Sequence, residues 1–290
     1  MRQTVVSLTV FLMLTSASIT APAALDADAI GSAAGAAATT AADGVVSIGW
    51  SRDDVAVQVD GMPFRPQAGL GSWAAFKETP GGAMVMGDTV VFQDEVDAAM
   101  DAAFEGGLEI TALHNHFFYD DPKVYFMHIG GRGAAVELAR GVKAMWNAVK
   151  DVRRAKAVPA KRFGGRIPEY GALDIAEIGR IIGVQCTINN GVVKASVPRE
   201  GTMNGTTVGG SMGLSSWAAF SGSDDLAAMD GDIIMTADEV QSTLKRLRKA
   251  GVHIVSLHNH MIGDEPAFFF THFWATGPAA ELAAAFKSSL

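Results

Sequence analysis

The sequence contains an internal repeat, and this repeat limits the folds that the chain can adopt. The segment Ser72-Trp73-Ala74-Ala75-Phe76 recurs 144 residues later as Ser216-Trp217-Ala218-Ala219-Phe220. The offset holds without a gap from residues 72–139 to residues 216–283, with roughly 26 identities among the 68 aligned positions. Self-similarity over such a length indicates two copies of one structural unit.

Each copy shows the same order of predicted elements. In the second copy, Asp238 to Lys249 has apolar residues at helical spacing. Residues 253–260 and 268–274 are rich in β-branched, aliphatic and aromatic residues, which predict two strands, and a last helix follows over residues 279–287. This order predicts an α+β fold of two homologous repeats, each a mainly antiparallel sheet with helices packed on one face.

The first residues have the pattern of a targeting segment. Arg2 supplies a positive start, an apolar run follows that is too short to span a bilayer, and small residues surround Pro22. We therefore expect an exported protein, periplasmic or extracellular, with no membrane span in the mature chain. The predicted organisation is a signal peptide over residues 1–23, repeat unit 1 over 24–149, a basic linker over 150–171 and repeat unit 2 over 172–290. Within unit 1, the alanine-rich residues 24–44 predict a helix that ends near Gly44.

Composition narrows the classes of partner. The chain has 290 residues, 49% of them hydrophobic, which suits two domains with real cores. A net charge of −8 and a pI of about 5.3 argue against a nucleic-acid partner, which requires a basic face. Cys186 is the only cysteine, so no intrachain disulfide and no thiolate metal cage can form. We interpret the basic linker as a solvent-exposed connection between the two units. The alternative is that its basic residues form a patch that binds an anionic ligand.

Six of the seven histidines form two matching constellations. Side chains at i and i+2 of a strand share one face, so each His-Asn-His pair projects two imidazoles together. If the two strands of a unit pair as a hairpin, the later histidine approaches them. Three converging imidazoles form a site for a divalent transition metal, zinc first and copper or iron as alternatives. The predicted ligands are His258, His260 and His272 in unit 2 and His114, His116 and His128 in unit 1.

A carboxylate from the following loop is expected to complete each site. Glu265 takes this role in unit 2 and Asp121 in unit 1, each directly before a proline. Asp88 and Asp232 each follow a glycine, and for them we expect backbone capping in a turn, with a catalytic role as the alternative. The alternative for the histidines is a polar network of imidazoles bonded to carboxylates, without metal.

The second copy resembles a known family, the LppY/LpqO family of exported bacterial proteins, which is defined by a domain of unknown function. The resemblance rests on Leu257-His258-Asn259-His260-Met261, Glu265-Pro266, Phe269-Phe270-Thr271-His272-Phe273-Trp274-Ala275, the helix over 279–282, Gly231-Asp232 and Ser211-Met212-Gly213. It extends over both repeats and implies an exported protein with two tandem copies of the domain. It implies no activity. Lipid anchoring is not implied either, because no cysteine follows the apolar run.

Three functions are compatible with these patterns. The first is an exported divalent-metal-binding protein with one site in each repeat. The second is a metal-dependent enzyme, a hydrolase or an oxidoreductase, in which an open coordination position activates water or substrate. The third is a binding module for a small molecule or an envelope polymer, in which the histidines only form hydrogen bonds.

Overall fold

The computed structural model describes residues 24–290, and the predicted signal peptide lies outside this range. The first repeat contains α1 (Ala27–Ala34), β1 (Ala38–Thr40), β2 (Val46–Ser51), β3 (Val57–Val59), β4 (Met62–Phe64), a 3-10 turn (Pro66–Ala68), β5 (Gly71–Thr79), β6 (Gly82–Phe92), α2 (Val96–Glu105), β7 (Glu109–His114), β8 (Asp120–Asp121), β9 (Val124–Gly133) and α3 (Ala135–Ala155). The second contains α4 (Ile175–Ile182), β10 (Thr187–Asn189), β11 (Val192–Pro198), β12 (Gly201–Met203), β13 (Thr206–Val208), a 3-10 turn (Gly210–Met212), β14 (Ser215–Gly222), β15 (Ala227–Thr236), α5 (Val240–Lys249), β16 (His253–His258), β17 (Asp264–Glu265), β18 (Phe268–Gly277) and α6 (Ala279–Ser289).

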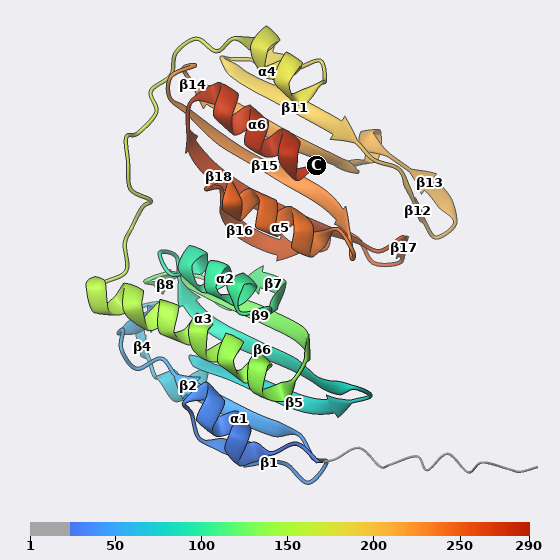
Figure 1. The fold of residues 1–290 in the computed structure, drawn as a ribbon. Coiled ribbons are helices and arrows are strands. Elements are labelled where there is room, and N and C mark those ends of the chain that lie inside the picture. Colours follow the sequence, from blue (N-terminus) through green and yellow to red (C-terminus); the bar gives the residue numbers. More distant parts are fainter. Residues whose placement is uncertain (1–23) are drawn as a thin grey trace, which may run out of the picture.

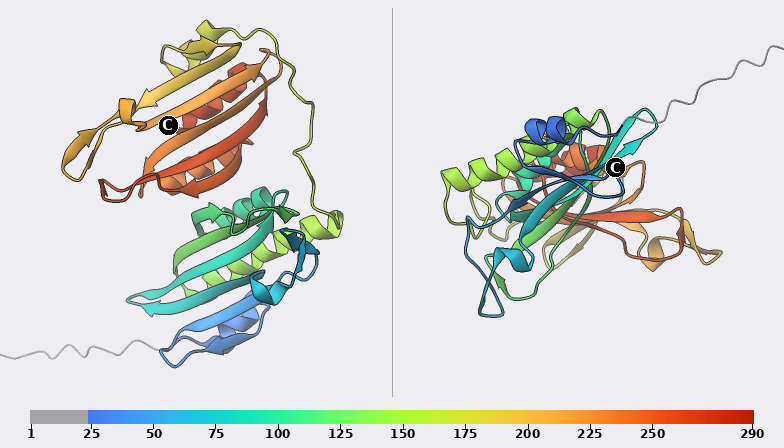
Figure 2. Two further views of the ribbon diagram at one scale, coloured as in Figure 1. Left: turned by 180° about the vertical axis from the view of Figure 1, so that it is seen from behind. Right: turned by 90° about the horizontal axis from the view of Figure 1, so that it is seen from below.

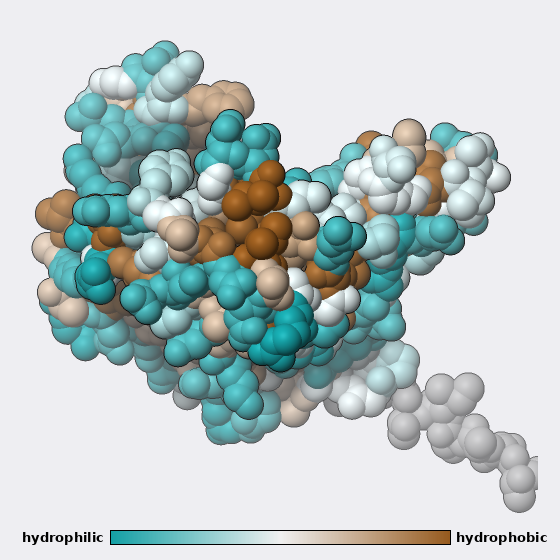
Figure 3. Space-filling view, turned by 90° about the horizontal axis from the view of Figure 1, so that it is seen from above, coloured by the Kyte–Doolittle hydropathy of each residue, from teal (hydrophilic) through white to brown (hydrophobic). Residues whose placement is uncertain are grey.

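The strands of both repeats join in one 12-stranded antiparallel sheet, ordered β1-β2-β5-β6-β9-β7-β16-β18-β15-β14-β11-β10. The repeats meet where β7 pairs with β16, with Leu113 opposite Leu257. Two small sheets, β4-β3-β8 and β13-β12-β17, stand out from the large one (Figures 1 and 2). The arm formed by β12 and β13 also projects from the body in the space-filling view (Figure 3). The α+β prediction, with two repeats, is confirmed.

All helices of the described chain cover one face of the large sheet, and the opposite face, here called the open face, carries none (Figure 2). The pleat of each strand divides its side chains between these faces. In β15, Met229, Ile233 and Met235 are buried in the core under the helices. Leu113 and Leu257 are buried in the same core, so the residues next to them along the strands, His114 and His258, are directed to the open face.

Polar contacts reinforce the junction between the repeats. Arg248 of α5 donates to both carboxylate oxygens of Asp101 in α2 at 2.9 Å, and its Nη1 lies 2.7 Å from Asp97 Oδ1. The Gln241 side chain bonds both the N–H and the carbonyl of Ile110, at 3.0 and 2.8 Å. These contacts bind the second repeat to the first beyond the single strand pairing.

Two predicted boundaries differ from the structure. The first helix ends at Ala34 rather than near Gly44, because Gly35 adopts a left-handed conformation (φ 65°) and its N–H bonds back to the last turn. At the other boundary, the predicted linker over 150–171 begins inside α3, which continues to Ala155. Arg153, on the last turn of α3, is buried and contacts Asp94 and Glu95, which holds this turn against the first repeat.

An arginine–glutamate pair recurs at equivalent places in both repeats. Arg52 donates to the two oxygens of Glu95 at 2.8 and 2.9 Å and to the carbonyl of Val90 at 2.8 Å. Arg199 donates to Glu239 at 2.6 and 2.9 Å. The first pair is fully buried, whereas the side chains of the second are 33% and 39% exposed. Burial of Glu95 raises its pKa, against the opposing effect of Arg52.

This difference predicts unequal losses of stability for one substitution at two matched positions. Within the described part of the chain, Glu95→Ala leaves Asp54 as the only carboxylate partner of the buried Arg52 and also removes a partner of the buried Arg153. It is therefore expected to lower the free energy of unfolding by roughly 3–5 kcal/mol. Glu239→Ala removes a partly solvated pair and is expected to cost about 1 kcal/mol or less. Chemical denaturation of both variants measures the difference, and equal losses would contradict it.

Candidate metal centre

Three histidines of the second repeat converge on the open face. His258 is the last residue of β16, His260 follows two residues later, and His272 lies in β18. Each offers a ring nitrogen that lies within 4.8 Å of the other two. The ring centroid of His258 is 5.0 Å from that of His260 and 5.1 Å from that of His272. Such a cluster has the dimensions of a metal-ligand set.

The pairing of β16 with β18 brings these histidines together. The two strands are antiparallel, with Ser256 opposite His272 and His258 opposite Phe270. The register shifts between Ile254 and Ser256, as at a β-bulge, which re-aims the side chains that follow it. The shift leaves Leu257 in the core and directs His258 to the open face. The hairpin predicted from the sequence is therefore present.

Asp232, a residue that the sequence analysis assigned to backbone capping, lies beside these histidines. It is on β15 directly opposite His272, it is only 2% exposed, and its Oδ2 is 3.4 Å from His260 Nε2. Its Oδ1 has no hydrogen-bond partner among residues 24–290. The capping role is therefore wrong, because this side chain extends from a strand toward the histidine cluster.

Burial changes the protonation of this cluster. It raises the pKa of Asp232 from 3.8 to about 6, against the opposing effect of His272. It also lowers the pKa of His258, with the charge of His272 as the next cause, and the pKa of His260, with the charge of His258 as the next cause. The two imidazoles are therefore held neutral, with free lone pairs, beside a carboxylate that lacks a cation. A divalent cation would satisfy all of these groups together.

The orientation of His272 fits metal binding. Its Nδ1 lies 3.1 Å from the carbonyl oxygen of Gly231, the residue before Asp232. A carbonyl only accepts, so Nδ1 carries the proton and donates, which leaves Nε2 with its lone pair toward the cluster. Metal-binding histidines usually have such a partner on the second ring nitrogen.

Glu265, the carboxylate predicted as fourth ligand, does not join this group of three histidines. It is exposed in β17, where it pairs with Thr202 of β12. The neighbouring Asp264 accepts a hydrogen bond from the N–H of Phe268 at 2.7 Å, which closes the loop before β18. Glu265 stays a predicted ligand, whereas Asp232 is the carboxylate that the sheet places at the cluster.

The first repeat has the same residues at similar ring spacings: the centroid of His114 is 5.2 Å from that of His116 and 5.0 Å from that of His128. His128 Nε2 lies 3.0 Å from His114 Nε2. The ring of His116 stacks on Phe126 with a centroid distance of 3.3 Å, as the ring of His260 stacks on Phe270 at 3.5 Å. Asp88 is buried, and its Oδ2 is 4.0 Å from His128 Nε2. Asp121 is exposed in β8 and pairs with Gln58. Within residues 24–290, only the second-repeat histidines form a group of three or more with all ligand atoms inside 4.8 Å.

Comparison with known proteins identifies a family. The family described as Domain of Unknown Function (DUF1259) matches residues 28–148 and again residues 176–290. The chain belongs to this family. The two matches agree with the tandem repeat, while the name LppY/LpqO, given above on resemblance, is not confirmed by them. No curated protein matches the chain.

One solved structure, a trimeric bacterial microcompartment shell protein PduB, matches at 9% identity. The match covers 87% of this chain and 89% of that chain, with a TM-score of 0.21. At this TM-score the match has no bearing on the fold or the function.

The Asp232 geometry predicts an unusual effect of Asp232→Asn on the metal-free protein. The change removes a buried charge at constant shape, so at neutral pH it should raise the free energy of unfolding by roughly 1–3 kcal/mol. The folded-state pKa is raised from 3.8 to about 6, so protonation stabilises the wild type below that range. The advantage of the variant should therefore be full above about pH 6 and vanish toward pH 3.8.

Denaturation of chelator-treated protein at the two ends of this pH range measures the effect. A loss of stability in Asp232→Asn at neutral pH would contradict it, since the carboxylate would then be a structural partner of the imidazoles.

Proposed function

We propose that this protein binds one divalent transition-metal ion in its second repeat, through His258, His260, His272 and Asp232. The observation that supports this most directly is the pairing of three converging imidazoles with a buried carboxylate whose Oδ1 has no partner among the described residues. A buried ionised carboxylate is unfavourable unless a cation or several donors compensate it. The proposed ion supplies that compensation.

The ligand set narrows the identity of the ion. Three imidazole nitrogens and one carboxylate oxygen suit Zn²⁺, with Fe²⁺ and Cu²⁺ as further candidates, and disfavour Ca²⁺ and Mg²⁺, which prefer oxygen ligands. We also propose that the protein acts outside the cytoplasm, on the basis of the targeting pattern in residues 1–23. No helix in the described range is both long and apolar enough to cross a membrane.

Metal-dependent catalysis is the second candidate function, and the exposure of His260 favours it. His258 and His272 are partly buried, whereas His260 is exposed, so solvent reaches one side of the cluster. A metal with an open position lowers the pKa of bound water and polarises a substrate. Asp232 would then serve as a ligand or accept a proton from that water.

Metal content is the first quantity to measure. Wild-type protein, purified without a metal-binding tag, should contain or take up close to one equivalent of zinc, iron or copper. His258→Ala/His260→Ala should lose it, because two of the four proposed ligands are removed. The matched variant His114→Ala/His116→Ala should keep it. Elemental analysis and metal titration compare the three proteins, and unchanged content in His258→Ala/His260→Ala would refute the assignment.

The proposed site also predicts how metal affinity depends on pH. Protons compete with the ion for Asp232, whose pKa is about 6, and for imidazoles whose pKa is lowered. Affinity should therefore be level above neutral pH and fall as pH decreases through about 6. Competition with a chelator, corrected for the protonation of the chelator itself, measures this. If the metal affinity one pH unit below the pKa of Asp232 equals the affinity at neutral pH, the proposed ligand set is wrong.

A further inference from the structure

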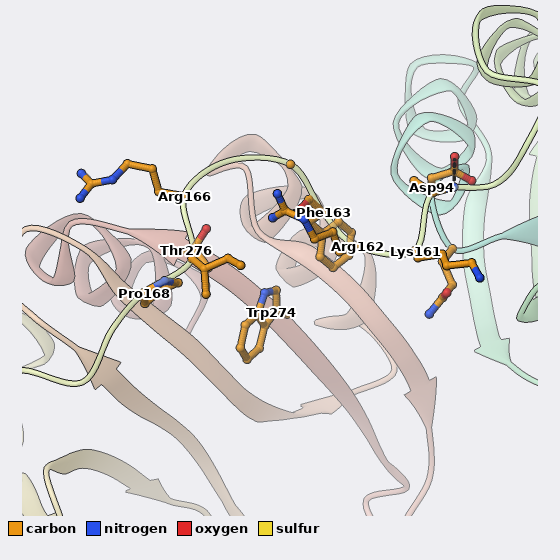
Figure 4. A pocket seen from close by; sticks show the side chains of 12 residues that line it. Asp94, Lys161, Arg162, Phe163, Arg166, Pro168, Trp274 and Thr276 are labelled. Atoms are coloured by element: carbon orange, nitrogen blue, oxygen red, sulfur yellow. Dashed lines mark hydrogen bonds between the residues drawn. The ribbon is translucent and has the colours of Figure 1, made fainter.

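A cavity of about 480 Å³ lies beside the histidine cluster, where the segment between the repeats crosses the second repeat (Figure 4). Its walls come from this segment, from β18 and from the turn before α2. The volume lies within the range of small-molecule sites. None of the proposed metal ligands lines the cavity.

Two aromatic side chains fix the position of the cavity. Trp274 follows His272 by two residues on β18, so both lie on the open face, separated by about 7 Å along the strand. Opposite Trp274 is His253, and the ring of Phe163 stacks on that of His253 at 3.6 Å with an angle of 7°. His253 in turn contacts Asp97 of the first repeat. This series of contacts holds the segment between the repeats over the sheet.

The cavity has a surplus of positive charge. Lys161, Arg162 and Arg166 line it, and none of them forms an ion pair within residues 24–290. Within residues 24–290, the hydrogen bonds of the Arg162 side chain go to the carbonyl oxygens of Phe163 and Gly165, both at 3.3 Å. The carboxylate on the rim, Asp94, is already engaged by Arg153 and by the N–H of Ala160. Figure 4 shows Arg162 beside Phe163, whereas Arg166 extends away from Trp274 and Lys161 lies toward Asp94. Arg162 is therefore the cation placed closest to the aromatic side chains, in a chain whose net charge is −8.

We propose that this cavity binds a small organic anion with a flat aromatic ring, such as an aromatic carboxylate. The ring would pack against Trp274 and Phe163, and the anionic group would be held first by Arg162, with Arg166 and Lys161 adding positive charge around the cavity. The sequence provides one such site per chain, because Gly130 occupies the position in the first repeat that corresponds to Trp274. The proposal does not rest on the metal ion, although a bound ring would lie next to His272.

The test uses 2-naphthoate as probe and 2-naphthalenemethanol as its neutral counterpart, with chelator-treated full-length protein. Calorimetry should show saturable binding of about one naphthoate per chain, and the neutral compound should bind about tenfold more weakly or worse. Trp274→Ala and Arg162→Gln/Arg166→Gln should each weaken naphthoate binding by about tenfold or more.

Matched variants control for nonspecific effects. Trp73→Ala removes an exposed tryptophan of the first repeat, and Arg140→Gln/Arg154→Gln removes two exposed arginines outside the cavity. Both should bind naphthoate as the wild type does. His258→Ala/His260→Ala should also bind it, which separates this site from the proposed metal centre.

Three results would overturn the proposal. They are the absence of saturable naphthoate binding up to about 1 mM, equal affinity for the neutral compound, and unchanged affinity in Trp274→Ala. Loss of metal binding together with retained naphthoate binding would refute only the metal proposal.

Discussion

The register of β16 against β18 determines both the core and the histidine cluster. Because side chains alternate between faces, a slip by one residue would move Leu257 out of the core and His258 into it. Burial of Leu257 among apolar side chains therefore fixes the orientation of His258. The bond from the hydroxyl of Thr271 to the carbonyl of Ser256, at 2.8 Å, supports the same register. The burial of apolar side chains thus positions the candidate ligands on the opposite face of the same strands.

The buried carboxylate of Asp232 shows that this arrangement is not optimised for the stability of the metal-free protein. Gly231, directly before Asp232 on β15, is tightly packed: a Cβ there would lie 2.2 Å from the carbonyl oxygen of Trp217 and 2.4 Å from the Phe273 ring. The backbone that carries Asp232 is therefore packed against its neighbours, and the charge remains where solvent does not reach it. A buried charge lowers the stability of the folded protein. Such a loss of stability at a group of potential ligands is typical of a functional site.

The sequence predicted the parts of the site that lie close together along the chain. The spacing of His258 and His260 implied one strand face, and the hairpin to His272 followed from two β-prone runs. Asp232 was assigned a turn because it follows a glycine, but it lies in a long strand that reaches His272 through the pairing of β15 with β18. No local pattern reports such a pairing. One signal was available: Asp88 and Asp232 are matched in the repeat, as the histidines are. Glu265 was favoured by its nearness in sequence, whereas β17 belongs to a separate small sheet.

The two repeats share their framework but differ on the open face. The arginine–glutamate pair recurs with the same backbone contacts: Arg52 bonds the carbonyl of Val90, and Arg199 bonds that of Ile234, its equivalent, at 3.3 Å. Around the histidines the repeats diverge, since Gly130 and Trp274 stand at matched positions. The segment between the repeats lies only over the second of these residues. The 12-stranded sheet requires the structural framework of both repeats, whereas a single ligand site is sufficient for function. The divergence therefore favours the second repeat as the one that carries the function, with the first as its structural partner.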